Sequence, residues 1–467
     1  MIKRTLKQIC SMMNNAEPLT SGIQQISITG VSTDTRTIQA GNLFVPLMGE
    51  NYDGHQYAQQ AYNLGAVAVL WQRDHKLSPV DIPVILVDHT LEALQQLAAS
   101  YRQQLPVRVI GITGSNGKTS TKDMVASVMG NRFRVHKTKG NLNNHIGLPQ
   151  TLLQMDETTE IAVVEMGMSG RGEIELLSRM ACPDAAIITN IGEAHMLQLG
   201  SREEIAKAKF EIMAGLRNDG VLIYLGDEPL LRELIPSQGT DFDIISFGSD
   251  SMLNDYSPQD IHIDIKQTRF SVTTSNNSKL ITELAIPLLG RHNVINALAA
   301  VAVAEFFGLD ESTIRSGLLQ TELTGMRIEL LQAKNGLTIL NDAYNASPAS
   351  MKAALLLLEE LLGYQHRLVV LGDMLELGPQ SESFHRDIGK LINSLNFDYI
   401  FTFGEMAAYI AEECRAQYSP NHVFEASDKA ELAKQIATVV TPQDIVLVKA
   451  SRGKRLEELV EALMQIE

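Results

Sequence analysis

A glycine-rich turn that ends in Gly-Lys-Thr is the clearest chemical signal in this sequence. The turn, TGSNGKT at 113–119, lies between a β-branched run and a stretch with apolar residues at helical spacing. The common phosphate-loop pattern GxxxxGK[ST] would place a glycine where Ile112 stands, but the glycines here are Gly111, Gly114 and Gly117. A turn between a strand and a helix directs backbone N–H groups and the positive end of the helix dipole at one point. The turn therefore predicts a phosphate cradle of a different spacing.

Side chains suited to a nucleotide and its metal ion follow this turn and two further strand-like runs. Lys118 can reach the β- and γ-phosphates, and the Thr119 hydroxyl can bind Mg²⁺. The run IAVVE ends in Glu165, and IITN ends in Asn190 with His195 close behind. Because ligands bind beyond the carboxyl ends of parallel strands, we expect Thr119, Glu165 and His195 to hold a metal ion. The plainer alternatives are a carboxylate that caps the next helix and a loop histidine bonded to backbone.

A lysine falls on the apolar side of the segment REEIAKAKFEIMAGL. At about 100° per residue, one helical stripe collects apolar side chains: Ile205, Ala208, Ile212, Met213 and Leu216. Lys209 lies inside this stripe and Lys207 lies almost opposite. A buried lysine is unfavourable unless it is paired, neutral or modified, so Lys209 is a candidate for a special role. The simpler explanation is a lysine that reaches solvent or forms an ion pair.

The last third of the chain also ends its strand-like runs in polar residues. These are Asp342, Tyr344, Asn345 and Ser347, then Asp373, and finally Lys449, Ser451 and Arg452. Two regions thus direct polar strand ends at ligands. A cleft that closes between them would exclude water, which suits an intermediate that hydrolyses easily.

Length, composition and charge limit the classes of protein to consider. A chain of 467 residues with 45% hydrophobic and 20% charged residues is typical of a globular protein of two to four domains. Its net charge of −16 argues against broad nucleic-acid binding. The three cysteines form no disulfide framework or zinc pattern, and the first residues carry no signal-peptide core. We therefore expect a cytoplasmic protein, a monomer without membrane insertion.

The run of short apolar segments predicts an α/β protein of three domains. Residues 1–104 form a small α/β domain that ends in the helical segment LEALQQLAASYRQQL. Residues 105–322 alternate strands and helices like a P-loop ATPase, with antiparallel strands expected in DIHIDIKQTRFSVTTS and LITELAIPLLG. Residues 323–467 alternate again and predict a Rossmann-like, doubly wound domain.

Taken together, these segments resemble the Mur ligases, ATP-dependent amide-forming enzymes of bacterial cell-wall precursor synthesis. Their phosphate loop has the form TGxxGKT, which matches residues 113–119. The segments TKGNLNNHIGLP, VVEMGMSGRGEI, TNIGEAH, AKAKFEI and GRHNVINALAA are also similar to family segments. The resemblance covers nearly the whole chain.

The resemblance implies a set of site residues. It implies catalytic roles for Lys118, Lys209 and His195, and two Mg²⁺ ions held by Thr119, Glu165, His195 and a carbamylated Lys209. ATP would contact Gly114, Ser115, Asn116, Gly117, Lys118, Thr119, Ser120, Asn296, Arg327 and Asp342. Substrates would contact Ser32, Thr33, Arg36, Asp53, Asn143, Asn144, Lys449, Ser451 and Arg452.

Within the family, the chain is most similar to the member that adds a dipeptide. The segments STDTRTIQAGNLFVPLMGENYDGHQY and NDAYNASPASM resemble that member, and the DNPR motif of the preceding ligase is absent. The resemblance implies that D-Ala-D-Ala is joined to UDP-MurNAc-tripeptide through an acyl phosphate, giving UDP-MurNAc-pentapeptide, ADP and phosphate.

Four other functions stay open at this point, and one is that of the preceding, amino-acid-adding ligase of the same family. A folylpolyglutamate synthetase would share the phosphate loop but would not need the first 100 residues. A switch or motor ATPase would favour the strict GxxxxGK[ST] spacing. A non-catalytic binding module would leave the metal ligands beside the phosphate loop unexplained.

Overall fold

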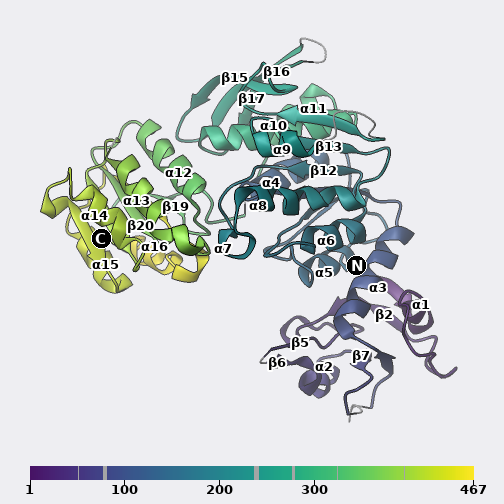
Figure 1. Ribbon diagram of the computed structural model, residues 1–467. Coiled ribbons are helices and arrows are strands. Elements are labelled where there is room, and N and C mark those ends of the chain that lie inside the picture. The colour runs from purple at the N-terminus through teal and green to yellow at the C-terminus, as the bar shows by residue number, and fades with distance from the viewer. Residues whose placement is uncertain are drawn as a thin grey trace.

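Three α/β domains make up the molecule, and the N-terminal and C-terminal domains lie on different sides of the central one (Figure 1). The computed structural model describes residues 1–50, 52–76, 81–235, 241–275, 279–322, 324–393 and 395–466. Within this part of the chain, no helix has the length and apolar character needed to cross a membrane. The three-domain α/β class expected from the sequence is confirmed.

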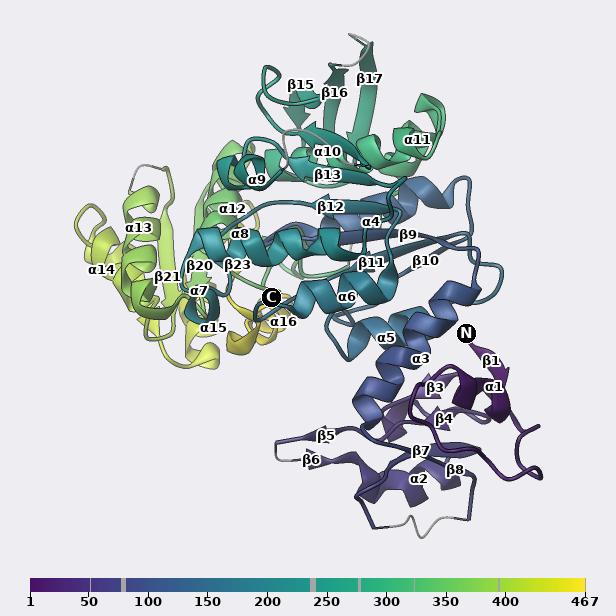
Figure 2. The same cartoon turned by 45° about the vertical axis from the view of Figure 1, so that its right-hand side comes forward.

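The N-terminal domain is built on a small parallel sheet. Its strands lie in the order β3 (Val31–Ser32), β4 (Leu43–Phe44), β7 (Ala68–Gln72) and β8 (Val84–Val87). Two antiparallel pairs accompany it: β1 (Lys3–Thr5) with β2 (Ser27–Thr29), and β5 (Met48–Gly49) with β6 (Tyr52–Asp53). The β5–β6 hairpin extends toward the side on which the C-terminal domain lies (Figure 2). The helices are α1 (Leu6–Ser11), α2 (Ala58–Asn63) and α3 (Thr90–Gln104).

The central domain carries a nine-stranded sheet. In spatial order its strands are β10 (Val135–Lys137), β11 (Ile161–Glu165), β9 (Arg108–Thr113), β12 (Ala185–Ile188), β13 (Val221–Leu225), β14 (Asp243–Phe247), β15 (Tyr256–Ile263), β16 (Thr268–Thr274) and β17 (Lys279–Ile286). The first six are parallel, and β15, β16 and β17 run antiparallel to one another, as the sequence predicted. The parallel strands are apolar along their length because helices cover both faces.

Alternation along β9 divides the interior of the central domain into two cores. Ile110 and Ile112 belong to one core, and Val109 belongs to the other. The first core includes the helices α4 (Lys118–Gly130), α10 (Arg291–Phe306) and α11 (Glu311–Leu319). The second includes α5 (Gly147–Leu153), α6 (Glu173–Ala181), α8 (Arg202–Phe210) and α9 (Pro229–Leu234). The short helix α7 (Met196–Leu199) lies where the central and C-terminal domains face each other (Figure 1).

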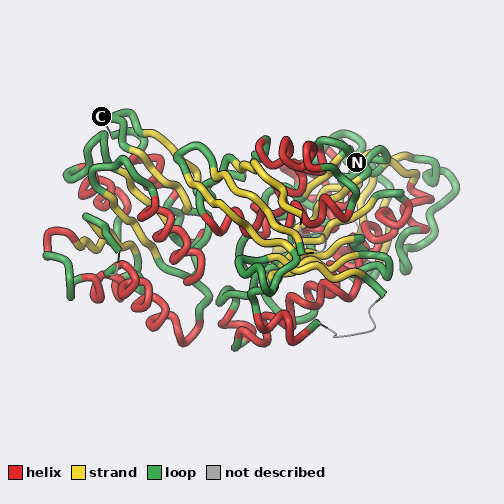
Figure 3. Tube along the Cα trace, turned by 90° about the horizontal axis from the view of Figure 1, so that it is seen from above, coloured by secondary structure: helices red, strands yellow, loops and turns green. Residues whose placement is uncertain are grey.

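The C-terminal domain is doubly wound. Its strands lie in the order β18 (Glu329–Gln332), β19 (Thr338–Asp342), β23 (Ile445–Lys449), β20 (Arg367–Gly372), β21 (Tyr399–Phe403) and β22 (Val423–Ala426), and all but β18 are parallel to their neighbours. One face packs on α12 (Pro348–Glu360), α13 (Ser381–Ile392) and α14 (Ala408–Cys414), and the other on α15 (Lys429–Ala437) and α16 (Glu457–Leu463). Figure 3 shows helices on both sides of the strands in this domain and in the central one.

Candidate active site

The phosphate loop joins β9 to α4 in the middle of the central sheet, with its N–H groups at the start of a long helix. Gly114 and Gly117 have φ angles of 147° and 79°, in the region that side chains disfavour. A side-chain carbon at Gly117 would also lie 2.5 Å from Asn296 Oδ1. The unusual glycine spacing of the sequence therefore matches the two positions where this loop has no room for a side chain.

Residues at the end of β12 brace this loop from the side. Asn190 Oδ1 accepts a hydrogen bond from Asn116 N at 2.9 Å, and Thr189 Oγ1 donates to Asn116 O at 2.6 Å. Gly192 N donates to Ser115 Oγ at 2.8 Å. Because each bond fixes a loop residue between the glycines, the cradle is held open before any phosphate binds.

Lys118 is folded onto its own loop. Its Nζ donates to Gly114 O at 2.7 Å and to Ser115 O at 3.3 Å. Burial lowers the pKa of Lys118, and the negative charge of Glu165 opposes that shift. The side chain thus lies beside the anion site without a carboxylate in direct contact.

Glu165 and Thr119 form a pre-arranged oxygen pair. Thr119 Oγ1 donates to Glu165 Oε2 at 2.8 Å, and Asn143 Nδ2 donates to Glu165 Oε1 at 2.8 Å. The backbone N–H of Glu165 donates to Thr138 Oγ1 at 3.0 Å. A buried carboxylate beside a hydroxyl is a donor set that suits Mg²⁺, so these residues fit the metal that the sequence implied.

Lys209 lies on α8, and His195 directly precedes α7. The expected burial is confirmed, since Lys209 is 2% exposed while Lys207 is exposed and pairs with Glu204 at 2.7 Å. Among the described residues, the Lys209 ammonium has no hydrogen-bond or ion-pair partner, and burial lowers its pKa well below the usual value. Burial, followed by the charges of Lys209 and Lys118, lowers the pKa of His195 to about 4.

His195 contacts the C-terminal domain. Its Nδ1 lies 2.9 Å from Glu376 Oε2, an ion-pair distance without the alignment of a hydrogen bond. Its backbone has a φ of 69°, which helps to present the ring at the start of α7. The imidazole therefore lies at the junction of two domains.

A cavity of about 420 Å³ separates the phosphate loop from the C-terminal domain. Twelve of the predicted site residues line it: Ser115, Asn116, Gly117, Lys118, Thr119, Ser120, Asn143, Glu165, Asn296, Arg327, Asp342 and Lys449. The structure thus brings together residues that are more than 300 positions apart in the sequence.

The C-terminal wall of the cavity is built around Tyr344. The Arg327 guanidinium lies 4.1 Å from the centre of the Tyr344 ring, a cation–π contact. Lys449 Nζ donates to Asp342 Oδ2 and, at 3.0 Å, to Asn345 O. Lys449 therefore fixes Asp342 in place and has less freedom to contact a substrate than its position at a strand end suggested.

Other predicted residues lie outside this cavity. In the part of the chain that the structure describes, the following do not line it: Gly114, His195, Lys209, Asn144, Ser451, Arg452 and the four N-terminal residues Ser32, Thr33, Arg36 and Asp53. Asn144 accepts from the backbone of Ile146 and Gly147, so it fixes the turn before α5. Ser451 Oγ accepts from Leu375 N at 2.9 Å and joins two C-terminal loops.

The predicted uridine-binding residues occupy the N-terminal domain. Arg36 has an 87% exposed side chain and binds Asp34 through two nitrogens, with Nε–Oδ2 at 2.9 Å. Ser32 is buried and donates to Asp34 O at 2.9 Å. Arg36 can therefore turn toward a ligand, whereas Ser32 supports the turn that carries it.

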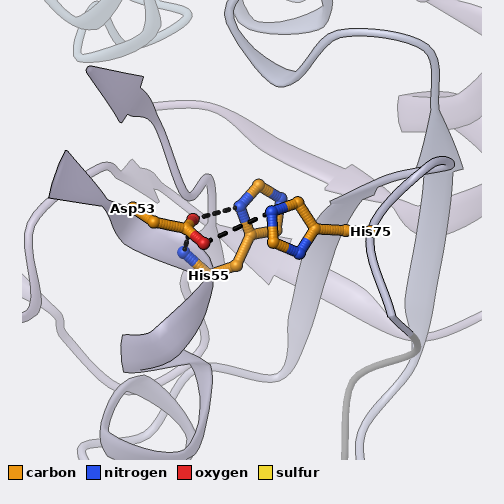
Figure 4. Close-up of side chains that lie close together, drawn as sticks. All are labelled: Asp53, His55 and His75. Atoms are coloured by element: carbon orange, nitrogen blue, oxygen red, sulfur yellow. Dashed lines mark hydrogen bonds and ion pairs between the residues drawn. The ribbon is translucent and has the colours of Figure 1, made fainter. Parts of the chain in front are cut away.

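The Asp53 carboxylate faces the stacked rings of two histidines (Figure 4). Its carboxylate is 2.8 Å from His55 Nδ1 and 3.3 Å from His75 Nε2, and the two rings stack at 4.3 Å. Three such ligand atoms could surround a metal ion. However, His55 Nε2 accepts from Gln72 N at 3.3 Å, so the proton of the neutral ring is on Nδ1 and points at Asp53. Hydrogen bonding accounts for the cluster, which fixes the turn before η2 (Gly54–Tyr57).

Three further residues of the site received no specific role from the sequence, although Ser347 was named among the polar strand-end residues. His292 lines the cavity at the start of α10, and burial lowers its pKa to about 4. Asp123 on α4 accepts two hydrogen bonds from Thr324, both at 3.0 Å, in the link between the domains. Ser347 Oγ donates to Asn116 Oδ1 at 3.0 Å across the cavity. Of these, His292 and Ser347 stood in quoted motifs, whereas Asp123 gave no local signal.

Comparisons with known proteins agree with this geometry. Residues 27–102 match the profile of the Mur ligase family catalytic domain, 112–304 that of the Mur ligase middle domain, and 326–452 that of the Mur ligase glutamate ligase domain. The chain is 50% identical over 467 residues, covering 100% of itself and 99% of its relative, to the UDP-N-acetylmuramoyl-tripeptide–D-alanyl-D-alanine ligase of Bacillus subtilis.

Solved structures show the same arrangement of domains. MurF from Acinetobacter baumannii superposes with a TM-score of 0.86 at 30% identity and covers 99% of each chain. MurF ligase from Thermotoga maritima in complex with ADP gives a TM-score of 0.81 at 29% identity, over 93% of this chain and 97% of that one.

Proposed function

The chain belongs to the Mur ligase family, and from that premise we propose that it joins D-Ala-D-Ala to UDP-MurNAc-tripeptide with hydrolysis of ATP. The products are UDP-MurNAc-pentapeptide, ADP and phosphate, in the synthesis of peptidoglycan precursors. The enzyme is thus an ATP-dependent ligase that forms a C–N bond. Such substrates are nucleotides of the bacterial cytoplasm, and we assign the protein to that compartment as a monomer.

The observation that carries this proposal is the cavity between the phosphate loop and the C-terminal domain. One wall offers N–H groups, Lys118 and the Glu165–Thr119 pair, and the other offers Arg327, Asp342 and the Tyr344 ring. In this arrangement the first wall would contact the phosphates of ATP, and the second would contact its base and ribose. A motor or switch ATPase needs no second domain of this kind facing the γ-phosphate.

The three domains divide the work in this proposal. Residues 1–104 bind the uridine nucleotide, 105–322 bind ATP, and 323–467 form the Rossmann-like domain that closes over ATP and receives the dipeptide. The full-length similarity to a tripeptide–dipeptide ligase supports this assignment over a folylpolyglutamate synthetase, which would not need the first domain.

The chemistry follows from the charges around the γ-phosphate. The terminal carboxylate of the tripeptide attacks phosphorus, ADP leaves, and an acyl phosphate forms. Lys118 and the loop N–H groups are placed to stabilise the negative charge that spreads over the phosphoryl oxygens. The free amine of D-Ala-D-Ala then attacks the acyl carbon, loses a proton, and phosphate leaves. The second domain excludes water that would otherwise hydrolyse the acyl phosphate.

Magnesium fits the residues present. Thr119 and Glu165 would hold one ion, and His195 with a carbamylated Lys209 would hold a second. When bound, the ions supply positive charge to the phosphate oxygens. The neutral amine that burial favours at Lys209 can add CO₂ and release a proton, which gives an anionic carbamate in place of a cation without a partner.

The test is an acceptor-dependent assay with the purified full chain. With ATP, Mg²⁺ and UDP-MurNAc-tripeptide, phosphate release should require D-Ala-D-Ala, and ADP should accumulate in equal amount. Pyrophosphate among the products, or a rate indifferent to the dipeptide, would exclude this function. A parallel assay with glutamate in place of D-Ala-D-Ala distinguishes the proposed function from folylpolyglutamate synthesis, because glutamate should not support phosphate release.

A further inference from the structure

One carboxylate at the junction of the central and C-terminal domains has no cationic partner. Glu376 lies in the loop after β20, at the carboxyl-end edge of the C-terminal sheet. Its side chain is 53% exposed, and its Oε2 contacts His195 Nδ1 at 2.9 Å. Among the described residues, no lysine or arginine forms an ion pair with it. An imidazole is not a permanent cation, so the charge of Glu376 stays available to a ligand.

Two other carboxylates at this edge of the sheet are already paired. Asp342 is bound by Lys449. Asp373 is bound by Lys454 at 2.5 Å and accepts from Ala407 N at 2.7 Å. Of these three strand-end carboxylates, only Glu376 therefore lacks a cation of the protein.

The backbone of the loop holds Glu376 in an unfavourable conformation. Its φ is 65°, in the left-handed region that a side chain other than glycine, asparagine or aspartate seldom adopts. The Glu376 carbonyl accepts from Leu197 N at 3.2 Å, and the preceding residue, Leu375, donates through its N–H to Ser451 Oγ at 2.9 Å. Contacts from the central domain and from the neighbouring C-terminal loop thus keep a strained residue in place. Strain of this kind is concentrated at functional positions.

The surroundings indicate what the carboxylate can bind. Glu376 contacts His195 through its side chain and Leu197 through its carbonyl, so it lies on the side of the C-terminal domain that meets the central domain. The next loop, fixed to Leu375 through Ser451, carries Arg452, whose side chain is 54% exposed and pairs with Glu457 at 3.3 Å. Its guanidinium lies 5.7 Å from the centre of the Tyr344 ring, which lines the cavity. A carboxylate and a guanidinium on adjoining loops match a small zwitterion.

We propose that Glu376 binds the ammonium group of the amine acceptor beside the acyl phosphate. One proton of this group passes to the half-exposed carboxylate and on to solvent, which leaves the neutral nitrogen that attacks the acyl carbon. The acceptor is D-Ala-D-Ala under the proposed function, on which this inference rests. Arg452 on the adjoining loop would face the acceptor carboxylate. Glu376 thereby acts in the second half of the reaction and leaves phosphoryl transfer to the central domain.

The decisive experiment compares two ligands with two proteins. The dissociation constants of D-Ala-D-Ala and of propionyl-D-alanine, which lacks only the ammonium group, are measured by calorimetry for the wild type and for Glu376→Gln. UDP-MurNAc-tripeptide and a non-hydrolysable ATP analogue are present throughout. We expect Glu376→Gln to weaken D-Ala-D-Ala by about 10-fold, the low end for a charge-assisted contact because the side chain is half exposed. Propionyl-D-alanine should bind equally to both proteins. Equal losses for both ligands, or no loss, would overturn the proposal.

Two further variants separate binding from folding. Glu376→Gly removes the carboxylate and the backbone strain together, so it should raise or maintain the melting temperature while it weakens D-Ala-D-Ala as much as Glu376→Gln. Glu405→Gln, at an exposed carboxylate of the same domain, is the matched control and should leave acceptor affinity unchanged. Restored acceptor affinity in Glu376→Gly would contradict a role for the carboxylate.

The partial reaction distinguishes this inference from the proposed function. Acyl phosphate formed from ATP and UDP-MurNAc-tripeptide can be trapped with borohydride without any dipeptide. Glu376→Gln should form it at the wild-type rate. If the wild type forms none, or releases no phosphate with D-Ala-D-Ala, the proposed function fails; if Glu376→Gln loses the trapped product, Glu376 acts elsewhere and only this inference fails.

Discussion

The central domain meets its two neighbours in opposite ways. Toward the N-terminal domain the contact is a continuous apolar core, which contains Leu97 of α3 together with Leu152 of α5 and Leu177 of α6. Polar groups inside it are satisfied: Tyr101 Oη donates to Met155 O at 2.9 Å, and Arg102 Nε donates to Ala181 O at 2.6 Å. This interface is packed like the interior of a single domain.

Toward the C-terminal domain the contacts are mostly polar and separate. They include Ser347 with Asn116, Glu376 with His195, and Arg291 with Glu360 at 3.0 Å. Leu289 adds an apolar contact. Asn116, one of these contact residues, also lines the cavity. Polar, separate contacts exchange readily with water, so this interface suits a movement that admits ATP, and the apolar one suits a fixed assembly.

The largest effect should come from a single change on the polar side. Lys209→Arg keeps a positive charge but cannot carry a carbamate, so we expect the ligase rate at saturating Mg²⁺ to fall by at least about 100-fold. The free energy of unfolding should change little. Lys209→Ala should also fail, and added acetate should restore part of its rate by replacing the missing oxygens. Lys207→Ala, on the exposed side of α8, is the control. A fast Lys209→Arg enzyme would show that Lys209 is an ordinary buried lysine.

At the apolar interface with the N-terminal domain, a single substitution should lower stability rather than activity. Tyr101→Ala removes a fully buried ring between the two domains, so we expect the free energy of unfolding in urea to fall by about 3–5 kcal/mol. Tyr101→Phe removes only the hydrogen bond to Met155 O and should lower it by about 1 kcal/mol. The KM for ATP should stay the same in both. A changed KM for ATP with unchanged stability would reverse the contrast between the interfaces.

Two residues of the N-terminal domain should show the same contrast between a loss of binding and a loss of stability. Arg36→Ala should weaken UDP-MurNAc-tripeptide by about 10-fold, because its exposed guanidinium is free to turn from Asp34 to a phosphate, while ATP affinity stays the same. Asp53→Ala should instead lower the stability of the domain by about 1 kcal/mol, because it removes the cap of η2 and the bond to His55. Calorimetric titration and thermal melting of each variant separate the two outcomes.

The smallest effect concerns the link between the central and C-terminal domains. Thr324→Val removes the hydroxyl that donates to Asp123 and keeps the N–H that also donates to it, so we expect a loss of about 1 kcal/mol. Because Arg327 follows only three residues later, this loss should appear as a severalfold rise in the KM for ATP. Thr324→Ser restores the hydroxyl and should restore the KM. An unchanged KM in Thr324→Val would mean that the link does not position Arg327.

The parts of the molecule that could be predicted depend on residues near one another in sequence, and the parts that could not depend on contacts between distant residues. The phosphate turn, the antiparallel strands β15–β17 and the buried Lys209 follow from residues that are near in sequence, so their patterns were sufficient. Asp123 and Glu376 act through partners about 200 positions away, Thr324 and His195, and no local pattern marks them. Asn144 and Asp53 were expected to contact substrate, and this stays a prediction. Short side chains near a helix start also bond to the local backbone: Asn144 does so in the turn before α5, and Asp53 does so as the cap of η2.

The shared core of the first two domains also limits how this gene can recombine. A crossover between relatives near position 104 would combine an α3 from one parent with α5 and α6 from another, and their buried side chains would no longer match. A crossover near position 323 would change only a few hydrogen bonds and ion pairs between the domains, and many sequences can form such contacts. Natural exchange and laboratory shuffling should therefore recover functional hybrids at the second boundary far more often than at the first. The C-terminal domain is thus the part of the protein that can be exchanged between relatives as a unit.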